Sequence, residues 1–380
     1  MKTRFAALAI AAAMAVSALT GCGSGNLNSD DVVAEFGDTK IKAGVAEFYA
    51  RYQQASYEAY YMPYYGDNMW TTEVSDGSTY EDSVKNNALD TLKTMYVLET
   101  HMDEYNVEYT SDDEAAVAEA AQAFVDANDG EALSASAGNI ENVKEVLKLI
   151  TIQRKMYNAM IEDADTEVSD DEAAQKSMSY AFFSFETTDD SGNKTTLDDD
   201  GKVALKETAM NFQTEAANGT KTFEECAEKA GVEAQTATFD SDTTSPSTDL
   251  IKAADVLGEG QVTDVIETDS GYYVAKVTSM LDREATDAKK TSIISERQQT
   301  LYNDLCKEWV DDADITVHEN VWKKLDFTKH GVTMKTQSNT DNTESGSDST
   351  TDSNTDSNTD NTESGTDTNT ETNSATESNK

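Results

Sequence analysis

The chain has 380 residues, and its 73 acidic residues against 29 basic ones give a formal net charge of −44. This excess of negative charge excludes a nucleic-acid-binding surface and disfavours attraction to anionic lipid headgroups. The sequence holds three histidines and two prolines, so we expect no metal site, no cofactor and no catalytic triad that depends on histidine. Outside the N-terminus, no apolar run reaches the roughly 18 residues that a membrane span requires.

The N-terminus has the layout of a bacterial lipoprotein signal peptide, which we assign to residues 1–21. Two basic residues precede a short apolar run, and the sequence LTGC then ends at Cys22. This ending resembles the lipobox, in which the cysteine thiol receives lipid and becomes the mature N-terminus. We therefore expect Cys22 to anchor the chain to the lipid bilayer at the outer face of the bacterial cell membrane. Residues 22–29 would form a flexible tether.

The C-terminus is a polar tail, residues 338–380. It consists of Ser, Thr, Asn, Asp, Glu and Gly, apart from Ala375 and Lys380. Without aromatic or branched aliphatic side chains it cannot bury enough apolar area to offset the entropy of ordering. We therefore expect a disordered acidic tail.

Two further cysteines, Cys226 and Cys306, lie on predicted helices. Their spacing matches no metal-binding motif. If Cys22 is consumed by lipid, both remain outside the cytoplasm, where disulfides can form. Two free, partly buried thiols and one disulfide both fit the sequence.

The body begins with a predicted hairpin and continues as a helix. Residues 31–41 alternate apolar and polar side chains around a Gly-Asp turn, and a helix follows from about Gly44. Residues 57–70 are dense in tyrosine, and we expect the chain to leave the helix there, around Pro63. We favour core packing for these aromatic side chains. The alternative is an adaptable apolar surface for extended polypeptides.

Further helices are predicted by apolar residues that recur at steps of three and four. A capping box at Ser111–Glu114 starts one of them, and a similar box lies at Ser169–Glu172. Such boxes fix helix starts, so we assign their carboxylates to capping before catalysis. The predicted helices cover residues 84–105, 111–124, 139–161 and 285–312.

Between residues 177 and 284 the pattern changes to mixed strands and helices. We therefore expect a compact α+β unit inserted between helical segments. The predicted strands cover residues 178–185, 262–268 and 272–280, and the predicted helices cover 202–217, 222–230 and 250–257.

One acidic loop in this unit has the spacing of a calcium-binding loop except at its first ligand. Thr196, Asp198, Asp200 and Gly201 are followed by Glu207. No predicted helix precedes the loop, as a calcium-binding helix-loop-helix would require. We therefore favour a simpler role, in which Asp200 caps the following helix.

Several local motifs accompany this order of parts. Val33-Ala34, Gly37 and Ile41 occupy the first strand region, and the insert contains TFEECAEKA at residues 222–230 and TDSGYYVAKV at residues 268–277. With the lipobox, these motifs resemble the extracytoplasmic foldases of the PrsA/SurA type. In that family the insert is a parvulin-like peptidyl-prolyl cis-trans isomerase domain.

The resemblance implies an α+β fold class. A helical SurA-N-like chaperone domain would be built from both ends of the chain, with an inserted parvulin-like α+β domain and a disordered tail. The helical domain would comprise residues 30–176 and 285–330, and the parvulin-like domain residues 177–284. It also implies that a strand at residues 314–318 pairs with the strand at residues 32–36.

The resemblance places the family's two histidines at Tyr180 and Tyr273, which are the candidate catalytic residues. The candidate substrate-binding residues are Phe182, Asp255 and Leu257, and Asp255 stands where the family has the phenylalanine of its proline pocket. A carboxylate there opposes burial of an apolar ring. Isomerase activity is left open, because the two tyrosines either take part in a hydrogen-bond network or pack together.

The sequence thus predicts a membrane-anchored extracytoplasmic folding factor, a foldase or chaperone with weak or no isomerase activity. Its partners would be unfolded or partly folded exported proteins, with no nucleic acid among them. The alternatives are a solute-binding lipoprotein, which would need strands alternating with helices in two lobes, and an inert surface spacer. The clients and the oligomeric state are not predicted.

Overall fold

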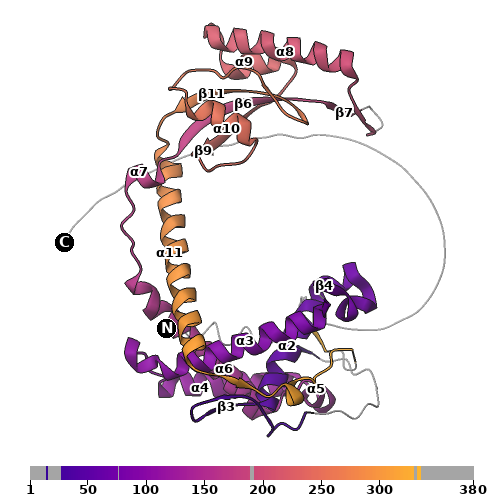
Figure 1. Ribbon diagram of the computed structural model, residues 1–380, viewed down its shortest axis with the longest axis vertical. Helices are drawn as coiled ribbons and strands as arrows, with labels where there is room; N and C mark the ends of the chain where they lie inside the picture. Colours follow the sequence, from indigo (N-terminus) through magenta and orange to yellow (C-terminus); the bar gives the residue numbers. More distant parts are fainter. Residues whose placement is uncertain (1–13, 16–26, 76, 189–191, 329–331, 335–380) are drawn as a thin grey trace, which may run out of the picture. The chain divides into compact units, whose positions relative to one another are not determined.

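Figure 1 shows a computed structural model of the protein, which describes residues 14–15, 27–75, 77–188, 192–328 and 332–334. The predicted lipidation site Cys22, most of the predicted signal peptide and the predicted tail lie outside these residues. A two-residue strand, β1 (Met14–Ala15), pairs antiparallel with β13 (Thr333–Met334).

A three-stranded antiparallel sheet joins the two ends of the body. The hairpin of β2 (Val32–Phe36) and β3 (Thr39–Lys42) turns at Gly37, whose φ of 51° is a left-handed conformation that glycine adopts without strain. On the other side of β2 lies β12 (Thr316–Val317). The predicted hairpin and the predicted pairing of the two chain ends are confirmed.

The helices of the N-terminal half follow this hairpin along the chain. Short 3-10 helices and a small hairpin connect them. The helices are α2 (Ala43–Tyr65), α3 (Tyr80–Thr100), α4 (Ser111–Ala127), α5 (Gly130–Ala135) and α6 (Ile140–Met160). The connecting elements are η1 (Gly66–Thr71), β4 (Glu73–Ser75), β5 (Ser78–Thr79), η2 (Met102–Tyr105) and η3 (Ile161–Asp163).

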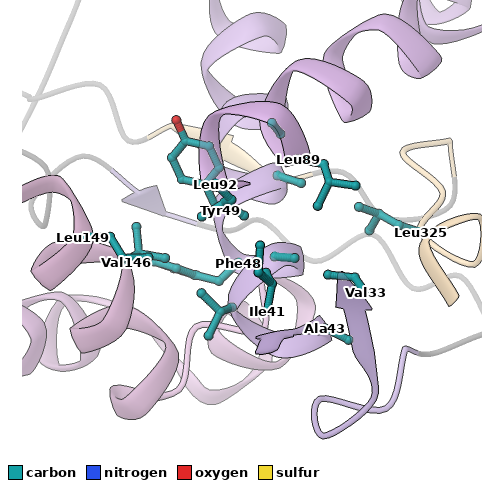
Figure 2. Close-up of a cluster of buried hydrophobic side chains, with 14 of the residues drawn as sticks. Val33, Ile41, Ala43, Phe48, Tyr49, Leu89, Leu92, Val146, Leu149 and Leu325 are labelled. Atoms are coloured by element: carbon teal, nitrogen blue, oxygen red, sulfur yellow. The ribbon is translucent and has the colours of Figure 1, made fainter. Parts of the chain in front are cut away.

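One apolar core holds the hairpin, these helices and the C-terminal segment together. Figure 2 shows Phe48 of α2 and Leu92 of α3 converging with Val146 of α6. Leu325, which follows α12 (Glu319–Trp322), is buried in the same cluster. Residues 80–163, all of which the structure describes, form helices and connections and contain no strand. The alternating strands that a solute-binding lobe requires are therefore not found there.

The long helix α11 (Arg283–Asp312) returns the chain to this helical part. Tyr302 and Cys306 of α11 form a second buried cluster with Leu98 of α3 and Met156 of α6. Beside α11 lies the short helix α7 (Asp170–Ala173), where Asp170 accepts hydrogen bonds from Arg283 and Lys290.

The inserted segment contains a four-stranded antiparallel sheet with strand order β10-β11-β6-β9. Helices α8 and α9 cover one face and α10 covers part of the other (Figure 1). The strands are β6 (Lys176–Ser184), β9 (Ala234–Phe239), β10 (Ile266–Glu267) and β11 (Gly271–Ser279), with a separate hairpin of β7 (Glu186–Thr188) and β8 (Lys194–Thr196). The helices are α8 (Asp199–Asn218), α9 (Phe223–Ala230) and α10 (Thr248–Asp255). The predicted fold class, an α+β segment inserted into a helical part, is confirmed.

Two strand predictions in this segment are wrong. The edge strand β9 was not expected, because its sequence AQTATF contains no Val, Ile, Tyr or Trp and is only six residues long. The strand expected at residues 262–268 is reduced to β10 and one isolated bridge between Val262 and Lys276. β9 pairs with β6, and β10 pairs with β11. These contacts between strands, and not the local sequence, determine which residues form the two strands.

Two predicted helix caps are displaced towards the N-terminus. Thr110, and not Ser111, caps α4, and its capping box closes with Asp113. Asp198, and not Asp200, caps α8, because its carboxylate accepts a hydrogen bond from the backbone of Gly201. In both places the sequence offers neighbouring residues of equal capping ability.

The helix end expected around Pro63 is confirmed. Helix α2 ends at Tyr65, two residues after Pro63, and Gly66 caps it with a φ of 67°. A proline in the last turn of a helix removes one backbone hydrogen bond. Core packing is wrong for part of the aromatic stretch, because Tyr60 and Tyr64 are exposed, whereas Trp70 is buried.

Cys226 and Cys306 are both free thiols, buried in different clusters. Of the two arrangements that the sequence left open, the structure has the unbridged one. Within the part of the chain that the structure describes, no helix combines the length and the apolar character that crossing a bilayer demands.

Candidate functional site

The two candidate catalytic residues, Tyr180 and Tyr273, lie side by side on one face of the inserted sheet. Tyr180 is on β6 and Tyr273 is on the neighbouring strand β11, where it lies directly opposite Phe182. Side chains alternate between the two faces of a strand. These three aromatic residues therefore share the face that α10 covers, and they pack against its apolar cluster.

The aromatic rings of this face are in mutual contact. The ring centroids of Tyr180 and Tyr273 are 6.2 Å apart, and Phe182 stacks on Tyr273 at 4.4 Å. The hydroxyl of Tyr180 donates a hydrogen bond to Oε1 of Gln235 at 2.5 Å. Gln235 lies on β9, so the missed strand supplied a site residue that the sequence did not indicate.

Burial affects the protonation of Tyr273. It raises the pKa of Tyr273, and the neighbouring phenol of Tyr180 adds to the rise. Tyr273 therefore keeps its proton at neutral pH and cannot serve there as a general base. The three histidines of the chain are residues 101, 318 and 330, so no imidazole is available within residues 176–282.

The remaining predicted site residues divide into two groups. Leu257 packs against the same apolar cluster as Phe182, so the structure brings these two residues together with the tyrosines. Asp255 is not part of the cluster. Its carboxylate lies 2.9 Å from Nζ of Lys176, which also donates to its carbonyl oxygen at 2.6 Å. The carboxylate is thus neutralised by an ion pair at the margin of the aromatic face.

Two hollows adjoin β6 away from the aromatic rings. One of about 460 Å³ lies between the sheet and the start of α9 and is lined by Ser179, and one of about 660 Å³ lies along β6 and β9 and is lined by Ser177. Hydroxyl side chains such as Thr278 line both hollows. Neither hollow touches the five predicted catalytic and substrate-binding residues.

No group of three or more His, Cys, Asp or Glu side chains within the described residues is arranged to hold a metal ion. In the acidic loop that resembles a calcium site, Thr196 belongs to β8 and Asp198 is engaged in capping α8. The capping role thus falls to Asp198, next to the residue that the sequence indicated.

A comparison with protein families identifies the class of domain. Residues 152–290 match the PPIC-type PPIASE domain. The predicted resemblance to parvulin-like peptidyl-prolyl isomerases is therefore confirmed for this segment of the chain. The match begins within α6 and ends within α11, so it extends beyond the sheet and its helices on both sides. No curated protein matches the chain.

Among solved structures, the chain is similar to foldases and chaperones. The foldase PrsA of Lactococcus lactis shares 15% identity at a TM-score of 0.34, over 77% of this chain and 96% of that one. PrsA of Streptococcus pneumoniae shares 20% identity at a TM-score of 0.29, over 68% and 98%. A SurA-like chaperone of Campylobacter jejuni shares 14% identity at a TM-score of 0.26, over 76% and 98%.

Proposed function

We propose that this protein is an extracytoplasmic, lipid-anchored folding factor whose PPIC-type domain binds polypeptide and isomerises prolyl bonds weakly or not at all. The observation that carries the proposal is the contact of Tyr180 and Tyr273 with each other and with Phe182, at the two positions where the sequence resemblance places the family's histidines. On this alignment the imidazoles of the family are replaced by phenols.

The physical reason lies in the barrier to rotation of the prolyl amide. A catalyst must lower a barrier of about 18–20 kcal/mol by holding the proline ring in an apolar slot and by hydrogen bonding to the twisted amide. Here Phe182 stacks on Tyr273, so the faces of these two rings contact each other and are not open to a proline ring. The ion pair of Asp255 and Lys176 lies where the family has an apolar pocket residue. Both features oppose proline binding.

A protease-coupled assay on a proline tetrapeptide tests the enzymatic half of the proposal. We expect turnover close to the uncatalysed rate, and the same rate for Tyr180→Phe and Tyr273→Phe. The folding half is tested with an unfolded client protein, whose aggregation the full chain should suppress. Rapid turnover that either phenylalanine variant abolishes would overturn the inactive assignment. Failure to suppress aggregation at any ratio would overturn the chaperone assignment and favour an inert spacer.

The membrane anchor rests on the lipobox alone. Cys22 lies outside the described residues, so the support is the order of basic residues, apolar run and LTGC. We expect the wild-type chain to partition into detergent and the Cys22→Ala variant to remain in the aqueous phase. An N-terminal peptide that carries no lipid mass would refute this part of the proposal.

A further inference from the structure

A cluster of tyrosines forms at the C-terminal end of α2, where the sequence analysis expected core packing. We call it the tyrosine cluster. Five of its rings contact one another, with centroid distances from 4.8 to 6.5 Å. These five are Tyr57, Tyr60, Tyr61 and Tyr65 of α2 and Tyr80 at the start of α3, and we include their exposed neighbour Tyr64 in the cluster.

Part of this cluster faces solvent. Tyr60, Tyr64 and Tyr65 have 68%, 80% and 60% of their surface exposed, and they are three of the largest exposed apolar side chains of the described residues. Burial of rings such as these stabilises a protein, so their exposure within one turn of helix is a cost without benefit to folding. Exposed aromatic clusters are typical of interaction surfaces.

The base of the cluster is fixed. Trp70 is buried beneath it, with its ring centroid 5.8 Å from that of Tyr80. The indole Nε1 of Trp70 donates a hydrogen bond to the buried carboxylate of Glu58 at 2.9 Å, and Gln54 donates to the same oxygen at 2.8 Å. The exposed rings therefore project from a rigid support, which reduces the entropy that binding would cost.

The sequence around the cluster is mostly acidic. Residues 53–83, which contain all six tyrosines, include six acidic residues and no Lys, Arg or His. Two of these acids have a basic neighbour from outside this range, since Lys85 lies 3.4 Å from Glu81 and Arg51 interacts with Glu58. The cation–π contacts found among the described residues involve rings outside the cluster. The electron-rich faces of the tyrosines are thus presented in a negative field, and no cation of the described chain covers them.

We propose that the tyrosine cluster binds lysine- and arginine-containing stretches of unfolded polypeptide. The inference rests on the proposed function, which supplies unfolded chains as partners, and adds where they bind and which side chains are selected. A cation over a tyrosine face is attracted by the ring quadrupole, and the acidic residues add long-range attraction. A second copy of the chain would bring the same acids to the same surface, and anionic lipid would be repelled.

The test measures binding of a labelled, unstructured Gly/Ser peptide with evenly spaced lysines to the full chain, by fluorescence anisotropy at low salt. Replacing three exposed rings by leucine, in Y60L/Y64L/Y65L, keeps apolar area and helix propensity but removes the π faces. We expect binding to weaken about tenfold, since exposed cation–π contacts contribute about 0.5–1 kcal/mol each. The phenylalanine triple variant should bind like the wild type. A peptide with glutamate in place of lysine should bind poorly to every variant.

The matched control is Val203→Ala with Met210→Ala, which removes exposed apolar side chains from α8 instead. This double variant should bind the lysine peptide like the wild type. Unchanged binding by the leucine variant, or equal binding of lysine and glutamate peptides, would overturn the inference. So would a leucine variant that changes only the self-association of the chain. If the wild type suppresses client aggregation in these cases, the proposed function stands without this binding surface.

Discussion

Tyr180 of β6 and Tyr273 of β11 lie on the same sheet face with ring centroids 6.2 Å apart, and Phe182 stacks on the second of them. The two candidate catalytic residues are thus part of an aromatic contact. Tyr273 is buried and Tyr180 is half-buried. If their role is packing, the energetic contribution of each ring should follow its burial.

The first prediction compares alanine variants of this pair. Tyr273→Ala should lower the free energy of unfolding of the sheet by about 3 kcal/mol, because it removes a buried ring. Tyr180→Ala should cost about 1 kcal/mol, because its ring is partly in water already. Hydrogen exchange of the β6 and β11 amides in increasing denaturant measures both values. Tyr273→Phe, which keeps the ring, is the control and should be nearly neutral. A larger loss for Tyr180→Ala would contradict a packing role.

The second prediction concerns the start of α4. Oγ1 of Thr110 accepts from the backbone nitrogen of Asp113, and the carboxylate of Asp113 accepts from the backbone nitrogen of Thr110 at 2.9 Å. Thr110→Ala should therefore cost about 1 kcal/mol of stability. Ser111→Ala, one residue away, should change it by less than about 0.5 kcal/mol. Equilibrium denaturation of the two variants decides between them, and the reverse order would restore the cap that the sequence pattern indicated.

These caps show how far local sequence information reaches. The sequence T-S-D-D-E offers two possible capping boxes: Ser111 with Glu114 fits the S/T-x-x-E/Q pattern, whereas Thr110 is followed at the third position by the shorter acid Asp113. The helix itself was predictable, since Val117, Ala121 and Phe124 recur on one face and are buried. Its first residue was not, because packing of the whole helix decides which box closes.

The sheet shows a different limit. β6 and β11 carry aromatic and branched residues and were predictable, whereas β9 became a strand through its pairing with β6. The site positions Tyr180 and Tyr273 came from resemblance to a family. Local patterns did not indicate that Gln235 meets Tyr180, since that contact joins residues 55 apart in sequence. Non-local contacts thus account for most of what the sequence left unpredicted.

The third prediction uses Asp240, which follows β9. Burial alone would raise its pKa, but hydrogen bonds from Gln175 and Thr243 and the charge of Lys289, 3.0 Å away, lower it well below its usual range. A carboxyl group with a depressed pKa stabilises the fold above its unfolded pKa, near 4, and loses that effect as the pH falls further.

Asp240→Asn should accordingly cost about 2 kcal/mol at neutral pH, since hydrogen bonds to charged groups contribute about 1.5–3 kcal/mol. The difference from the wild type should stay constant down to about pH 5 and shrink in more acidic solution. Thermal unfolding across this pH range measures it. The exposed neighbour Asp242 provides the control, because Asp242→Asn should leave the curve unchanged. A difference that grows on acidification would have the wrong sign for this account.

The last prediction concerns Gly271, which starts β11 beside the aromatic face. A Cβ atom added there would lie 2.2 Å from the carbonyl oxygen of Phe183 and 2.6 Å from the ring of Phe182. Real Cβ atoms do not approach backbone so closely, so β11 or β6 must shift. Gly271→Ala should therefore cost about 2–3 kcal/mol, as overpacking typically does, and should disturb the stacking of Phe182 on Tyr273.

Gly258 offers the matched control, because a Cβ atom there would meet only Gln261, at 3.4 Å. Gly258→Ala should change stability by less than about 0.5 kcal/mol. Denaturation followed by hydrogen exchange at β6 and β11 separates the two variants. If both alanines are tolerated equally, the close approach of β11 to β6 is not a constraint on the fold. The aromatic face would then owe its geometry to α10 and the ring contacts alone.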